Sequence, residues 1–108
     1  MGNIWNLTQH LATPEQRAGG VVDLPERLRK KVVELHTFDN LPERAELHER
    51  AAKLVMIAKE VCRENQLVMI GGAPFFMSTL EAFLTGVGVP FVYSFSRRIE
   101  KHEGFILL

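Results

Sequence analysis

One run of residues, LVMIGGAPF over positions 67–75, constrains the fold of this chain more than any other segment. Its four leading apolar residues predict a buried strand. Gly71 and Gly72 then allow a tight turn or a close approach of the backbone to a ligand, and Pro74 stands where a helix begins. In open α/β sheets, anions and nucleotides bind at such a strand–glycine–helix connection, although the same turn also occurs with a purely structural role.

The composition predicts a single domain over residues 1–108, because 46% of the residues are hydrophobic and a chain of this length can bury its own core. Thirteen basic and thirteen acidic residues cancel, so we expect neither duplex nucleic acid nor a membrane as a partner. Cys62 is the single cysteine, which excludes an internal disulfide and fits a reducing compartment. Without a signal sequence or an apolar run of about 18 residues, a cytoplasmic protein is expected.

A capping box marks the first predicted helix. Thr13 has the form of an N-cap, Pro14 follows it, and Gln16 stands three residues after the cap. Gly19 and Gly20 are expected to end this short helix.

Two further helix starts share one pattern, DLPER at residues 23–27 and NLPER at residues 40–44. Each pattern places an Asx residue three positions before a glutamate, so Asp23 and Asn40 are predicted to cap the helices that follow. The apolar spacing predicts that the second of these helices is long, over residues 41–64.

Strands are predicted from the apolar patterns over residues 3–8, 67–70, 89–95 and 105–108. Residues 21–22 form either a further brief strand or a buried connector. A helix over residues 75–85 lies between two of the strands. This order of strands and helices favours a small Rossmann-like three-layer α/β fold with a mostly parallel sheet.

Three of the predicted strands finish in polar or glycine-rich sequence, at residues 8–10, 71–72 and 94–98. Because the carboxyl ends of parallel strands lie at one edge of a sheet, these segments should meet where open α/β sheets bind their ligands. We therefore predict a site for a nucleotide or another phosphorylated small ligand at this edge. The predicted ligand-binding residues are Thr8, Gln9, Gly71, Gly72, Ala73, Ser94, Ser96, Arg97 and Arg98.

The predicted site residues have different chemical roles. Backbone N–H groups of residues 71–73 would bind phosphate, and Arg97 or Arg98 would pair with its charge unless both arginines are only solvated. His10 is the candidate catalytic acid–base group for metal-independent phosphodiester hydrolysis, although a histidine at a strand end also serves as a hydrogen-bonded structural residue.

Several motifs that would narrow the function are missing from the sequence. The glycine turn has neither the third glycine of a dinucleotide fingerprint nor the lysine of a P-loop. Ser94 and Ser96 lack a nucleophile elbow, so we interpret them as hydrogen-bond donors. No cofactor is predicted and no metal site, because the remaining histidines are scattered over positions 36, 48 and 102.

The segments NLTQH at residues 6–10, ATPEQ at residues 12–16 and GGAP at residues 71–74 resemble those of a small bacterial and phage family. That resemblance covers most of the chain and implies no particular activity. The compact size and the polar strand ends also resemble those of the CRISPR-associated Rossmann-like (CARF-type) proteins. This second resemblance implies a cyclic oligonucleotide ligand bound across a symmetric homodimer.

An alternative of a different class is a non-catalytic interaction or regulatory protein. The apolar residues 75–77 and 105–108 would then cover a dimer interface or present an edge strand to a partner. Under either hypothesis we expect a homodimer, because so small a domain ending in an apolar strand has little surface to spare.

Overall fold

A computed structural model describes residues 2–97 and 102–107, with residues 95–97 and 102–107 described through their backbone alone. The chain forms, in order, β1 (Ile4–Asn6), α1 (Pro14–Ala18), β2 (Val21–Asp23), α2 (Glu26–His36), α3 (Arg44–Val61), β3 (Leu67–Ile70), α4 (Pro74–Gly86), β4 (Phe91–Arg97) and β5 (His102–Leu107).

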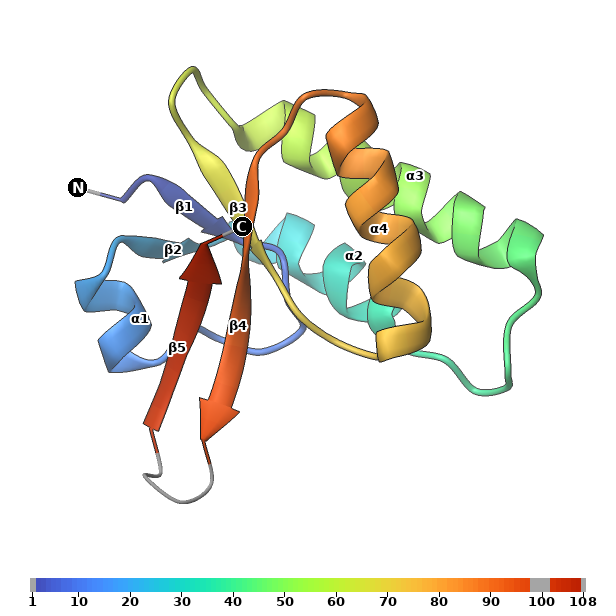
Figure 1. The fold of residues 1–108 in the computed structure, drawn as a ribbon, viewed down its shortest axis with the longest axis horizontal. Helices are drawn as coiled ribbons and strands as arrows, with labels where there is room; N and C mark the ends of the chain where they lie inside the picture. The colour runs from blue at the N-terminus through green and yellow to red at the C-terminus, as the bar shows by residue number, and fades with distance from the viewer. Residues whose placement is uncertain (1, 98–101, 108) are drawn as a thin grey trace.

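The strands form one sheet in the order β2-β1-β3-β4-β5 (Figure 1). The pairs β1–β2, β1–β3 and β3–β4 are parallel, and β5 is antiparallel to β4. The predicted small Rossmann-like α/β fold with a mostly parallel sheet is therefore confirmed. Residues 21–22, which the sequence left open, belong to a true strand that pairs with β1.

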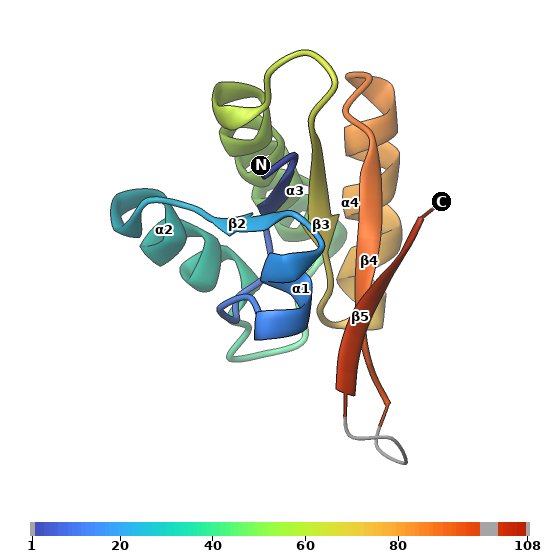
Figure 2. The same ribbon diagram turned by 90° about the vertical axis from the view of Figure 1, so that its left-hand side faces the viewer.

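Helices cover both faces of the sheet. Helices α2, α3 and α4 lie on one face and the short α1 lies on the other, as the two perpendicular views show (Figures 1 and 2). The alternation of side chains along β3 explains these layers, because Val68 and Ile70 join the core under α2–α4. Met69 points to the opposite face and packs with Ile4 and Val92 in a second, smaller cluster.

The capping box at the start of α1 is confirmed. Thr13 accepts a hydrogen bond from the backbone N–H of Gln16, whose side chain in turn accepts one from the backbone N–H of Thr13. The predicted end of this helix is also confirmed, because Gly19 is its C-cap.

The two predicted Asx caps are wrong. The N-cap of α2 is Pro25 and that of α3 is Glu43, and neither helix has a side-chain cap hydrogen bond. Asp23 lies at the end of β2 and its carboxylate binds Asn6, Ala12 and Arg17 instead. The Asp23 side chain, which the local pattern predicted to cap a helix, therefore belongs to a tertiary hydrogen-bond network instead.

The last two strands form an antiparallel hairpin, in which Arg97 pairs with His102. The predicted strand over residues 89–95 therefore begins later and continues further, and the final strand begins before residue 105. No helix of the part of the chain that the structure describes is long and apolar enough to cross a membrane.

Candidate functional site

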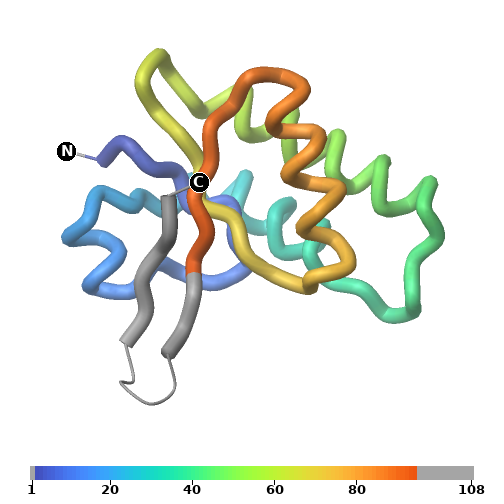
Figure 3. Tube along the Cα trace, in the orientation of Figure 1, coloured from blue at the N-terminus to red at the C-terminus, as the bar shows by residue number. Residues whose placement is uncertain are grey.

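The strand order places a topological switch point between β1 and β3. From β1 the chain moves to β2 on one side, and it then returns past β1 to form β3 on the other side. Doubly wound sheets with the order 2-1-3-4 bind ligands beyond the carboxyl ends of the two strands that flank this point. The segments after β1 and after β3 leave the sheet at the same end, as the chain trace shows (Figure 3). The candidate site is therefore this end of the sheet.

A buried hydrogen-bond network centred on Asn6 occupies the carboxyl end of β1. Asn6 is 3% exposed, and its Nδ2 donates to the carbonyl oxygen of His10 at 2.7 Å and to Oδ1 of Asp23 at 2.8 Å. Its Oδ1 accepts from the backbone N–H of Thr8 at 3.0 Å and from the Thr8 hydroxyl at 2.7 Å. Both donors and both acceptor positions of the amide are used, so the start of the following loop is fixed.

Asp23 holds the far end of the same loop. Its Oδ1 also accepts from the backbone N–H of Ala12 at 3.0 Å, and its Oδ2 pairs with Arg17 at 2.8 Å. The loop over residues 7–12 is therefore tied to β1, to β2 and to α1 at once.

At Gly71 the segments that follow β1 and β3 meet the middle of β4. A Cβ added at Gly71 would collide with Oγ of Ser94 and would lie 3.6 Å from Cγ2 of Thr8. Thr8 follows β1, Gly71 follows β3, and Ser94 belongs to β4. The convergence expected from parallel strands is therefore present for Thr8, Gly71 and Ser94, although residues 94–97 lie within β4 rather than after it. The close approach explains why residue 71 has no side chain.

His36, the last residue of α2, adds a fourth segment to this edge. It is 8% exposed, and its Nε2 lies 3.0 Å from the carbonyl oxygen of Leu7. A carbonyl only accepts hydrogen bonds, so Nε2 carries the hydrogen and Nδ1 of the neutral ring is an acceptor. Nδ1 lies 3.2 Å from the position that a Cβ would take at Gly72, and the ring packs edge-on against Phe76.

His36 is held in its neutral form. Burial lowers its pKa below the ordinary value of 6.5, and the hydrogen bond to Leu7 offsets this only in part. The nearby charges of His10 and Arg50 lower the pKa further. The ring therefore carries an unprotonated Nδ1 at pH 7.

Arg50 of α3 fixes the end of α2 that carries His36. Its guanidinium lies over the ring of Phe38, 4.2 Å from the centroid. The same group donates to carbonyl oxygens around the end of α2, those of Glu34, Leu35 and Thr37. Arg50 thus bonds carbonyl groups on both sides of His36, which limits the movement of that residue.

The first turn of α4 presents backbone donors at the same edge. Among the residues that the structure describes, the N–H groups of Gly72, Ala73 and Phe75 have no acceptor. Gly72 has a φ of 151°, a conformation that residues other than glycine rarely adopt. The first turn of α4 contains no acidic residue, so no carboxylate of that turn neutralises the positive end of the helix dipole.

The structure brings most of the predicted residues to one edge. Thr8 and Ser94 lie against Gly71, and Gly72 lies against His36. Gln9 and His10 lie on the loop after β1, with the side chain of His10 exposed, and Ala73 is the N-cap of α4. The side chains of Ser96 and Arg97 lie outside the described part, as does Arg98 altogether, so their roles stay predictions.

The sequence interpretation missed His36, although a signal for it exists. His36 follows Leu28 and Val32 at intervals of four residues, which places it on the buried face of α2. That spacing indicates burial, but it does not reveal which strand end the histidine meets. Within the described part of the chain, no group of three or more His, Cys, Asp or Glu residues could hold a metal ion.

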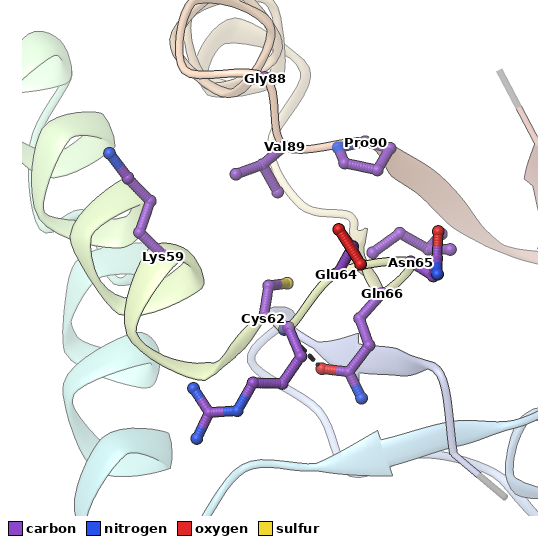
Figure 4. Close-up of a pocket in the computed structure, with 10 residues that line it drawn as sticks. Lys59, Cys62, Glu64, Asn65, Gln66, Gly88, Val89 and Pro90 are labelled. Carbon is purple, nitrogen blue, oxygen red and sulfur yellow. Dashed lines mark hydrogen bonds between the residues drawn. The ribbon is translucent and has the colours of Figure 1, made fainter.

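A hollow of about 510 Å³ lies at the opposite end of the sheet, before β3 and β4 (Figure 4). Of its polar groups, Oε1 of Gln66 already accepts from the indole of Trp5 and from the backbone N–H of Arg63. Burial raises the pKa of the Cys62 thiol, which favours its unreactive protonated form. The convergence of donors and a neutral imidazole therefore favours the carboxyl edge over this hollow.

Fold and site together define a small Rossmann-like α/β protein with a polar edge at its topological switch point. The chain belongs to the Uncharacterized protein MJ1673 family, whose model matches residues 2–104. Comparisons with curated proteins and with solved structures gave no match.

Proposed function

We propose that this protein binds a nucleotide or another phosphorylated small ligand at the carboxyl edge of its sheet. The observation that carries the proposal is the meeting of Thr8, Gly71 and Ser94 at the switch point, beside the open first turn of α4. Ligands of doubly wound sheets bind at such points, and helix N-termini favour phosphate.

Different groups at this edge would bind different parts of the ligand. The free N–H groups of Gly72, Ala73 and Phe75 donate to phosphate oxygens, and the positive end of the α4 dipole adds a favourable charge. Gln9 and Ser94 bind polar groups of the ligand, and one of the two arginines at positions 97 and 98 pairs with its negative charge. The resemblance to CARF-type proteins adds cyclic oligoadenylates to the ligands that deserve testing.

Catalysis extends the same proposal. His10 acts as the acid–base group of a metal-independent phosphodiester hydrolysis, a role supported by its exposed side chain on the loop that Asn6 holds. With any bound phosphodiester that the protein hydrolyses, His10→Ala should abolish turnover and leave binding intact. Unchanged turnover by this variant would remove the catalytic role of His10.

The binding proposal is tested by measuring thermal stability with phosphate, mononucleotides, sugar phosphates and cyclic oligoadenylates. A ligand present at about 100 times its Kd stabilises the folded chain by about 2.7 kcal/mol. Ala73→Asp places a carboxylate at the N-cap, where it caps α4 and repels phosphate, so folding should be maintained and the ligand-induced shift lost. Ala82→Asp introduces the same charge at an exposed position two turns along α4 and serves as the control.

The proposal is wrong if no compound of this panel stabilises the protein, or if Ala73→Asp keeps the full shift of the unsubstituted protein. The alternative of a homodimeric interaction protein has less support at residues 75–77, because Phe76 and Met77 are buried in their own chain. Phe75 remains 44% exposed, and the mass measured by sizing chromatography distinguishes a monomer from a dimer.

A further inference from the structure

We infer that His36 is part of the ligand site, where its Nδ1 accepts a hydrogen bond from a hydroxyl group of the ligand beside the phosphate. This inference rests on the proposed function and narrows the ligand to a phosphorylated compound with a free hydroxyl, such as a ribonucleotide or a sugar phosphate.

Nδ1 of His36 is the unused polar atom of a side chain that is more than nine-tenths buried. Nε2 donates to Leu7, and no described residue donates to Nδ1. Every fully buried side-chain nitrogen or oxygen of the described residues has a partner, so Nδ1 must be reached by solvent. An acceptor that is held in place, unpaired and open at one side is what a ligand donor requires.

Nδ1 of His36 lies close to Gly72, just before the end of α4 that is proposed to bind phosphate. A Cβ at Gly72 would lie 3.2 Å from Nδ1 and 3.4 Å from Cε of Met77, so the missing side chain leaves Nδ1 accessible there. The unpaired N–H groups at the entry to α4 begin at this same residue, just before the N-cap Ala73. A phosphate on these donors would therefore place its neighbouring atoms close to the imidazole.

The donor that meets Nδ1 is not the phosphate itself. A dianionic phosphate only accepts hydrogen bonds, as does the unprotonated Nδ1, so the two repel each other. The donor found beside phosphate in both nucleotides and sugar phosphates is a hydroxyl group.

The charged groups that act on the His36 ring favour its neutral form. His10 on the loop after β1 and Arg50 on α3 both disfavour the imidazolium form, and the carbonyl of Leu7 does not outweigh them and burial. From α4 the ring meets Phe76 and Gly72, which carry no titratable side chain. The acceptor form of Nδ1 is thus maintained through neutral pH.

The test compares three probes, adenosine 5′-monophosphate, its 2′,3′-dideoxy analogue and inorganic phosphate, by calorimetry with the full chain. A site built to accept a hydrogen bond from a hydroxyl rejects the analogue that lacks it, so we expect the dideoxy compound to bind at least about tenfold more weakly. His36→Phe keeps an aromatic ring and should bind both nucleotides equally. His48→Phe, on an exposed histidine of α3, should keep the discrimination.

A second measurement does not depend on a variant that folds. In ¹⁵N spectra of the unsubstituted protein, the Nδ1 resonance of His36 should report an unprotonated nitrogen and should shift with the monophosphate but not with the dideoxy analogue. Equal binding of the two nucleotides without a change at Nδ1 overturns the role of His36 and leaves the proposed function standing. Absence of binding by these three probes and by the sugar phosphates and cyclic oligoadenylates of the wider panel overturns both.

Discussion

The amide of Asn6 provides the sharpest test of how the candidate site is held together. Asn6→Ala removes four hydrogen bonds in a position that is 3% exposed, two donated by Nδ2 and two accepted by Oδ1. Each contributes about 0.5–1.5 kcal/mol net. Some partners have substitutes, because Asp23 keeps its bond to Ala12 and the Thr8 hydroxyl has the His10 carbonyl at 3.1 Å. The buried N–H of Thr8 has none.

We therefore expect Asn6→Ala to lower the free energy of unfolding by about 3 kcal/mol, which for a domain of this size lowers Tm by roughly 12 °C or more. Urea denaturation followed by circular dichroism measures the loss directly. Asn3→Ala, at an exposed position just before β1, should change the free energy by less than about 0.5 kcal/mol. A loss below about 1 kcal/mol for Asn6→Ala would refute the assignment of this network as the support of the loop.

Two further predictions concern the meeting of segments at the edge. Gly71→Ala should lower the free energy of unfolding by about 1–3 kcal/mol, because the new Cβ meets Oγ of Ser94. Most of that loss should vanish when Ser94→Ala is also present. If urea denaturation shows that the losses of the two single variants simply add, the contact is contradicted. Folding lowers the pKa of His36 below 6.5, so the unfolded chain takes up the proton first as the pH falls. The stability that the neutral His36 contributes is therefore complete above pH 6.5 and declines below it. The difference in unfolding free energy between the unsubstituted protein and His36→Gln should therefore shrink from pH 7.5 to pH 5, and a constant difference would show that the imidazole is not buried in its neutral form.

The sequence predicts those elements whose pattern is local. The run at residues 67–75 specifies β3, the glycine turn and the start of α4, because burial, backbone freedom and the proline act on adjacent residues. The capping box of α1 is equally local. Parallel strands then bring Thr8 and Gly71 to the same edge, since the direction of the strands decides at which edge they end. Ser94 meets them from within β4, which continues past this edge to Arg97.

What the sequence could not specify depends on partners far along the chain. Asp23 stands in the same local pattern as Asn40, yet its carboxylate is used by Asn6, which precedes it by 17 positions. His36 reaches Leu7 across 29 positions. Tertiary packing decides which hydrogen-bond partners such side chains have, because its contribution outweighs the small free energy of a helix cap.

The connection between β2 and β3 explains how His36 comes to the site at all. One helix is sufficient to cross a parallel sheet, and α3, with 18 residues, spans about 27 Å at 1.5 Å per residue. Helix α2 is additional, and its last turn ends beside the loop after β1 and the start of α4 rather than at the opposite edge. Phe38, just beyond α2, packs edge-on against Phe75 and Phe76 and anchors this arrangement. Helix α2, which the crossover does not need, buries Leu28 and Val32 in the main core. It ends with His36 beside the unpaired backbone donors before α4, which is the position that the proposed ligand site requires.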